Sequence, residues 1–301
     1  MLWAGLAGCA LMSERPPLAG GPVELDDTAF FPQEDYMCGP AALATVLDSS
    51  GVAVHPDELI GAMYIPERRG TLQVELASTA RRQGRLAVTL EMTPAALVAQ
   101  LEAGRPVLVL QNLASRLVPV WHYAVVVGYR PGADRFVLRS GGERRLEVGR
   151  GRFEATWERA DNWALVVLEP GQPPQDLPRE AYLQAAADLE NTGAHELALA
   201  AFRSAAAAWP REPTAVLGEA NNLYYLERFE EAAQAYRRLL QREPSHRVAL
   251  HNLSMLLVER DRPCAARAVL ADARALEGPL LETARRAVAR AAGPRCDGDA
   301  R

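Results

Sequence analysis

The stretch FFPQEDYMCGPAALATVLDSSG, residues 30–51, decides how the first half of this chain is interpreted. From Cys38 onward its apolar residues recur at helical spacing, Pro40 falls in the first turn, where a missing N–H costs little, and Gly51 can end the helix. The pattern therefore predicts a helix with Cys38 at its N-terminus. Backbone N–H groups and the helix dipole favour a thiolate there, so Cys38 is either a small buried hydrophobe or a prepared nucleophile.

Two residues outside this helix could complete a catalytic site with Cys38. Gln33 lies five positions upstream, where its amide could curl back and, with the Cys38 N–H, donate to a developing oxyanion; the alternative is a solvated loop glutamine. Far downstream, residues 118–142 place His122 at the start of a β run that a Pro-Gly turn returns antiparallel. His122 could be the base, although a histidine at a strand end is more often a structural hydrogen-bonding residue.

Taken together, the cysteine, the glutamine and the histidine carry a family resemblance. Residues from about Phe30 to Glu169 resemble the papain-like cysteine peptidases of the bacteriocin-processing group, which trim double-glycine leaders on peptide-exporting transporters. The motifs are Gln33 with Cys38-Gly39-Pro40, GRPVLVL (104–110) as a buried strand, and HYAVVVGY (122–129) with its return strand. The resemblance implies an α+β papain-like domain in which the Cys38 thiolate attacks a peptide carbonyl, His122 carries the proton, and Gln33 lies in the oxyanion hole.

One element of the family pattern is missing. In the family the return strand delivers an aspartate that orients the histidine, whereas this chain reads Arg139-Ser140-Gly141. If the turn centres on Gly132, the cross-strand neighbour of His122 falls near residue 142, within reach of Ser140 and Glu143. Asp134 then lies roughly 30 Å away at ~3.3 Å per residue. Ser140 is therefore the candidate orienting residue, and because serine stabilises imidazolium less than a carboxylate does, activity could be reduced or absent. Asp161 and Asn162 are weaker candidates.

The N-terminus resembles the signal of a bacterial lipoprotein. The eight-residue apolar run before Cys9 is too short to span a bilayer, which needs about 20 residues, but suits an export signal. Leu6-Ala7-Gly8-Cys9 resembles a lipobox, although no Arg or Lys precedes the run. The resemblance implies lipidation of Cys9, and Ala10 after it implies a periplasmic protein anchored to the outer membrane. Residues 1–29 are thus assigned to a signal and flexible tether; a chance match is the alternative.

The second half of the chain has a different composition. The stretch EPGQPPQDLP has four prolines in ten residues and predicts an interdomain linker over 170–178. After it, residues match at a period of 34: Ala186 with Ala220, Ala198 with Ala232, Phe202 with Tyr236, and Pro210 with Pro244. This resembles the tetratricopeptide repeat. It implies that residues 179–301 form an all-α solenoid of three repeats, the third degenerate, with a capping helix over 280–293.

Cys264 and Cys296 flank this predicted cap. In an oxidising periplasm they could form a disulfide that stabilises the fold by roughly 3 to 4 kcal/mol on the chain-entropy estimate. Two free thiols are an equally good alternative.

Composition excludes several classes of function. The 301 residues, 49% of them hydrophobic, suffice for two globular domains with separate cores. A net charge of −5 and the lack of a basic, aromatic-interleaved tract disfavour nucleic-acid binding. All 33 basic residues are arginine, which removes the P-loop lysine and Schiff-base chemistry. No metal-ligand spacing such as Cys-x-x-Cys occurs, so no metal site or cofactor is expected.

The leading hypothesis is an exported, lipid-anchored cysteine peptidase whose repeats hold a protein partner or present a peptide or protein substrate. The first alternative is a catalytically silent papain-like domain that binds a peptide, with the repeats as scaffold. The second is a Cys-dependent amidase or transpeptidase, because acyl transfer to other acceptors uses the same Cys-His chemistry. The sequence does not identify the substrate or the partner.

Overall fold

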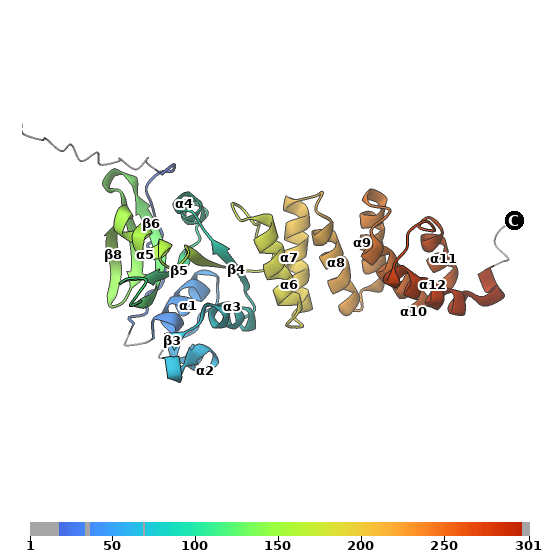
Figure 1. Ribbon diagram of the computed structural model, residues 1–301, viewed down its shortest axis with the longest axis horizontal. Helices are drawn as coiled ribbons and strands as arrows, with labels where there is room; N and C mark the ends of the chain where they lie inside the picture. The colour runs from blue at the N-terminus through green and yellow to red at the C-terminus, as the bar shows by residue number, and fades with distance from the viewer. Residues whose placement is uncertain (1–17, 34–36, 69, 297–301) are drawn as a thin grey trace, which may run out of the picture.

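The chain is an elongated molecule with a sheet at one end and a row of helices leading away from it (Figure 1). The computed structural model describes residues 18–33, 37–68 and 70–296. The main sheet is antiparallel, in the order β4-β9-β5-β6-β7-β8, with β1 beside β6. Its strands are β1 (Val23–Glu24), β4 (Leu86–Glu91), β5 (Val107–Asn112), β6 (Trp121–Arg130), β7 (Arg135–Ser140), β8 (Glu143–Gly149) and β9 (Trp163–Leu168). A small second sheet pairs β2 (Tyr64–Ile65) with β3 (Gly70–Thr71).

Helices cover both faces of the sheet, which explains why its central strands are apolar without alternation. One core packs α1 (Cys38–Ser49), α2 (Pro56–Met63) and α3 (Gln73–Arg82) against side chains such as Leu108 and Val125. The other packs α4 (Pro94–Glu102) and α5 (Arg150–Glu158) against the alternate side chains, such as Val109 and Val126. The expected α+β architecture is confirmed, and the predicted helix at Cys38 begins at that residue.

The sheet domain begins before the predicted boundary at residue 30. Val23 and Glu24 pair with Tyr129 and Gly128 of β6, and the Leu25 N–H donates to the Val127 carbonyl at 2.8 Å. A Cβ on Gly128 would lie 2.7 Å from the Val23 carbonyl oxygen, so this approach depends on glycine. The expectation of a flexible tether was therefore wrong for residues 23–28, because their backbone groups bond to the sheet. Residue Cys9 and the predicted signal lie outside the described residues.

The predicted linker, residues 170–178, is docked onto the sheet domain. Arg105 donates to the carbonyls of Gln175 and Pro173 at 2.7 and 3.0 Å, and Gln100 Nε2 donates to the Asp176 carbonyl at 2.8 Å. One apolar core continues from the sheet into the first helices of the second half. The expectation of two separate cores was wrong, since α6 packs against β4 and its buried side chains belong to the same core as those of the sheet.

Within the described residues, seven helices follow: α6 (Arg179–Glu190), α7 (His195–Ala208), α8 (Pro213–Tyr225), α9 (Phe229–Arg242), α10 (Arg247–Glu259), α11 (Pro263–Ala271) and α12 (Pro279–Ala292). Alternate helices start at 179, 213 and 247 and at 195, 229 and 263, so the starts recur every 34 residues. The small residues found at that period are buried at helix contacts, and Gly218 packs so closely on Phe202 that a Cβ would lie 2.4 Å from the ring. None of the helices described is both long and apolar enough to cross a membrane.

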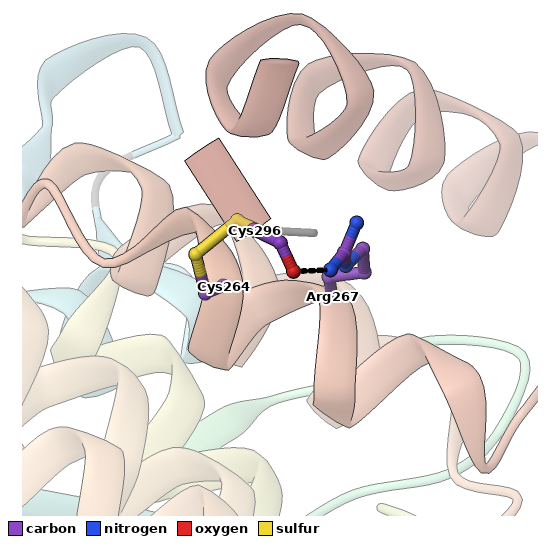
Figure 2. The surroundings of a disulfide bond; sticks show 3 residues. All are labelled: Cys264, Arg267 and Cys296. Carbon is purple, nitrogen blue, oxygen red and sulfur yellow. Dashed lines mark hydrogen bonds between the residues drawn. A yellow bond between two sulfur atoms is a disulfide. The ribbon is translucent and has the colours of Figure 1, made fainter. Parts of the chain in front are cut away.

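The end of the helical row is closed covalently. Cys264 of α11 and Cys296, in a short 3₁₀ turn (Gly293–Cys296) after α12, form a disulfide with an S–S distance of 2.10 Å (Figure 2). Arg267 donates to the carbonyl of Cys296. Both contacts hold the turn that follows α12 against α11.

Candidate active site

The predicted site residues meet at a cleft of about 690 Å³. Cys38, His122 and Gln33 all line it, although 84 residues separate the cysteine from the histidine along the chain. Cys38 is the first residue of α1, and His122 is the second residue of β6, so a helix start and a strand start meet at the same opening. The sheet and α1 thus bring together the nucleophile, base and oxyanion donor that the sequence suggested.

Ser140 orients His122 from behind. Its Oγ lies 2.8 Å from His122 Nε2, and the serine side chain is buried. The register brings the two residues near each other, because Val125 is opposite Arg139 and Ser140 therefore lies on β7 close to the start of β6. Among the described residues Nδ1 of His122 makes no hydrogen bond, so this nitrogen is available to a ligand or to a neighbouring group.

The other candidates for orienting the histidine do not reach it. Asp134 lies at the far end of the hairpin, where it accepts a hydrogen bond from Tyr129 OH at 2.8 Å. Glu143 pairs with Ser140 in the ladder between β7 and β8, and no hydrogen bond or ion pair joins it to His122 in the part of the chain that the structure describes. Asp161 does line the cleft, and both Asp161 and Asn162 adopt left-handed backbone conformations. Neither makes a hydrogen bond to His122 among the described residues.

Gln33 is held in a defined orientation. Its Oε1 accepts from the Gly141 N–H at 3.0 Å, and its backbone N–H donates to the Gly141 carbonyl at the same distance. Its Nε2 donates to the Tyr123 carbonyl at 3.4 Å, which leaves the second N–H of the amide for a ligand in the cleft. Gly141 therefore couples Gln33 to the turn that presents Ser140. Gly141 has φ +59°, a conformation that glycine adopts without strain.

Arg139, in the Arg139-Ser140-Gly141 stretch that departs from the family pattern, has a structural role. Its buried guanidinium donates to the carbonyls of Thr28, Asp26 and Arg144 at 3.3, 3.1 and 2.6 Å. It thereby fixes the segment after β1, which leads directly to Gln33. Sequence reasoning noticed Arg139 only as a break in a pattern and gave no hint of this function.

Thr71 closes the cleft against the start of α1. A Cβ on Gly39 would lie 2.7 Å from Thr71 Oγ1, so glycine after the cysteine is required for this contact. The Thr71 carbonyl accepts from Tyr123 OH at 3.1 Å. Arg68, Leu72 and Trp121 line the cleft as well, and sequence reasoning did not single them out. For Trp121, its position next to His122 in the sequence is the one signal that could have placed it at the cleft.

Burial, and not the helix terminus, dominates the ionisation of the two central groups. Burial raises the pKa of the Cys38 thiol, although the N–H groups of Tyr123, Gly39 and Cys38 itself act in the opposite direction. Burial lowers the pKa of His122. Both groups are therefore neutral near pH 7 in the unliganded site. The N–H groups at the helix start do favour the thiolate, as expected, but desolvation by burial is the larger effect and raises the pKa overall.

The sheet domain is similar in sequence to a family of peptidases. Residues 25–165 match the model of the Peptidase_C39 like family. A C39-like peptidase structure from Bacillus anthracis is 19% identical with a TM-score of 0.43, covering 50% of this chain and 98% of that one. The peptidase domain of Streptococcus ComA, a bifunctional ABC transporter of a quorum-sensing pathway, is 17% identical with a TM-score of 0.39, covering 47% and 98%. Comparison with the curated proteins gives no match. Residues 25–165 form most of an α+β domain that is similar to the C39-like peptidases, and a helical region follows this domain.

Proposed function

We propose that the chain is a cysteine peptidase in which Cys38 attacks a peptide carbonyl and His122 moves the proton. The observation that carries this proposal is a pair of hydrogen bonds that fix the orientations of two side chains at the cleft. Ser140 fixes His122 through Nε2, and Gly141 fixes Gln33 through Oε1. The side chains of His122 and Gln33 line the same cleft as Cys38. A histidine and an amide that are both held in fixed orientations at the cleft lined by Cys38 favour action on a common ligand.

The reaction begins from a neutral thiol and a neutral imidazole. As Sγ bonds to the carbonyl carbon, Nδ1 of His122 accepts the thiol proton, so the proton transfer and the attack belong to one step. The oxyanion that forms accepts hydrogen bonds from the Cys38 N–H and from the free N–H of Gln33 Nε2. His122 then returns the proton to the leaving amine. Water then attacks the thioester carbonyl while Nδ1 of His122 accepts its proton, and the C–S bond breaks as this proton passes to the leaving sulfur, which releases the carboxylic acid and restores the Cys38 thiol.

Ser140 contributes orientation without charge. Its Oγ accepts from the Nε2–H of the imidazolium, but it supplies no negative charge to stabilise that cation. This favours a slow enzyme.

The experiment that tests the proposal uses a peptide mixture and mass spectrometry. The full chain, and a Cys38→Ser variant as matched control, are incubated with a proteome-derived peptide mixture, and new N-termini are counted. New termini with the wild type and none with the variant support a peptidase. Product amines other than peptides would instead indicate an amidase or transpeptidase, and no Cys38-dependent product would refute catalysis.

A second candidate function is a catalytically silent domain that binds a peptide. The neutral state of both central groups and the serine at the orienting position favour it. The two candidates differ in one measurable property: a silent domain binds peptides in the cleft with equal affinity whether or not Cys38 is changed to serine, and releases them uncut.

The remaining parts of the chain suggest where the domain acts. We propose that α6 to α12 form three tetratricopeptide repeats with α12 as the cap, which the 34-residue recurrence of helix starts supports. A pocket of about 220 Å³ between α8, α9 and α10, lined by Asn221, Tyr224, Tyr225 and Asn252 among others, suits a protein partner. The lipobox-like stretch ending at Cys9 supports anchoring at the outer membrane, and radiolabelled palmitate incorporation into wild type but not Cys9→Ser tests it.

A further inference from the structure

A second cavity lies behind the histidine, on the side away from Cys38. It has a volume of about 400 Å³ and is lined by residues of β5, β6, β7, β8 and α5, but not by Cys38. His122 borders both this rear cavity and the cleft, whereas Ser140 borders only the rear cavity. The His122–Ser140 hydrogen bond is therefore the partition between the two spaces.

Ser140 has hydrogen-bonding capacity that points to a ligand. When its Oγ accepts the Nε2–H of His122, its own O–H remains as a donor. Among the described residues no acceptor takes that proton, and Ser140 is only 8% exposed. An acceptor in the rear cavity would complete a chain from the imidazole through the serine.

Arginine side chains make this cavity attractive to an anion. Arg135 and Arg152 both line it from its exposed edge; Arg135 donates to the Glu147 carbonyl at 3.2 Å, whereas among the described residues no hydrogen bond or ion pair engages Arg152. The single acidic residue in its lining, Glu147, already binds Arg130 at 2.9 Å and Arg145 at 2.5 Å. The net charge around the cavity is positive, although it borders a group that must become a cation during catalysis.

The walls of the cavity fit a small organic anion better than a single atom. Leu113, Leu138 and Leu146 supply apolar surface, while Gln111 and Thr156 form a buried pair at 2.6 Å. A volume of about 400 Å³ is far larger than the roughly 30 Å³ that one water occupies. Mixed apolar and cationic walls of this kind suit a carboxylate on a short carbon chain.

We propose that the rear cavity binds a small carboxylate, which accepts the hydrogen bond of Ser140 and supplies His122 with the negative charge that the chain itself lacks. This inference rests on the proposed role of His122 as a base. The bound carboxylate acts through Ser140 and stabilises the imidazolium from one hydrogen bond away. The ligand is either a free organic acid or the C-terminal carboxylate of a peptide, since both present the same group.

The test reads the imidazole directly and needs no turnover. The full chain with Cys38→Ser and ¹⁵N-labelled histidine is titrated by NMR, with the His122 signals assigned by their loss in a His122→Ala variant. Sodium acetate is compared with sodium chloride at equal concentration. Acetate is expected to raise the apparent pKa of His122 by about one unit, since an added negative charge nearby favours the protonated form. Chloride is expected to leave it unchanged.

Variants locate the effect. Arg152→Gln is expected to weaken the acetate response, and Ser140→Ala to abolish it, whereas Arg211→Gln, on an exposed loop of the helical region, is expected to respond like the parent chain. An equal response to chloride, no response to acetate at 100-fold excess over protein, or a full response in Arg152→Gln would each overturn the proposal.

A pair of peptides distinguishes the two sources of the carboxylate. A short peptide with a free C-terminus and the same peptide amidated are added to the parent chain. If the peptide with a free C-terminus raises the pKa of His122 as acetate does, and the amidated peptide does not, the site accepts peptide termini as well as small acids. If acetate raises this pKa and neither peptide does, the site accepts small acids. Because Cys38→Ser cannot cleave peptides, this result is independent of whether the wild type is a peptidase.

Discussion

Replacing Ser140 with aspartate is expected to convert the neutral pair of Cys38 and His122 into an ion pair. Ser140 Oγ lies 2.8 Å from His122 Nε2, so a carboxylate at this position would contact the imidazole directly. Two unit charges 4 Å apart attract by about 4 kcal/mol at an effective dielectric constant of 20. Burying the new carboxylate offsets part of this, and a net effect of at least about 1.4 kcal/mol, or tenfold, remains.

The assay is the rate of iodoacetamide alkylation of Cys38 between pH 5 and 10. Cys264 and Cys296 are joined, so Cys9→Ser leaves Cys38 as the single free thiol of the chain. In this background the wild-type rate is expected to rise through pH 9.0 and above it, because burial raises the pKa of Cys38 above that ordinary value. Ser140→Asp is expected to react at least about tenfold faster at pH 7, because iodoacetamide attacks the thiolate.

Ser140→Asn provides the matched control, because it has nearly the same size as aspartate and no charge. It is expected to leave the alkylation profile close to that of the wild type. The reasoning would be refuted if asparagine accelerated alkylation as much as aspartate, or if Ser140→Asp folded normally and kept the wild-type profile. A wild-type rate that is already constant below pH 7 would refute the neutral pair itself.

Three further predictions concern stability. Gly39→Ala is expected to destabilise the fold by about 1 to 3 kcal/mol in urea unfolding, because its Cβ meets Thr71 Oγ1 at 2.7 Å, whereas Gly61→Ala in α2, with open space around the Cβ, is expected to be neutral or stabilising. Equal losses for the two would contradict the close contact. Replacing both Cys264 and Cys296 with alanine is expected to lower stability by about 3 to 4 kcal/mol, since a separation of 32 residues is closed; an unchanged unfolding midpoint would rule this out. Burial lowers the pKa of His122, so its contribution to stability is present above the ordinary value of 6.5 and is lost as pH falls through the folded value. Between pH 7.5 and 5 the wild type should therefore lose more stability than His122→Gln, and parallel losses would count against it.

The sequence predicted the parts of the site that depend on local pattern. Cys38 starts a helix because the pattern from Cys38 to Gly51 is helical, and counting residues around the Pro-Gly turn placed Ser140 near His122 and Asp134 far from it. Both results rest on short-range rules of spacing and register.

The rest depended on contacts between distant segments. Strand β8 was not predicted because its charged residues hide the short alternation of Leu146 and Val148, and β1 was assigned to a tether because two residues carry no pattern. The ionisation of Cys38 could not be predicted from its place in a helix, since burial by β3 and β6 decides the direction. The rear cavity is lined in part by α5, a helix that no sequence motif predicted.

The core that runs from the sheet into α6 has a practical consequence for anyone dividing this protein. A fragment cut after Glu169, where the sequence pattern places the boundary, would lack α6, whose buried Tyr182 and Leu183 belong to the same core as Leu86 and Val88 of β4. Such a fragment would expose an apolar surface and is expected to aggregate. A cut after α7, within the loop that precedes Pro213, retains α6, so the minimal unit for expression is longer than the family match.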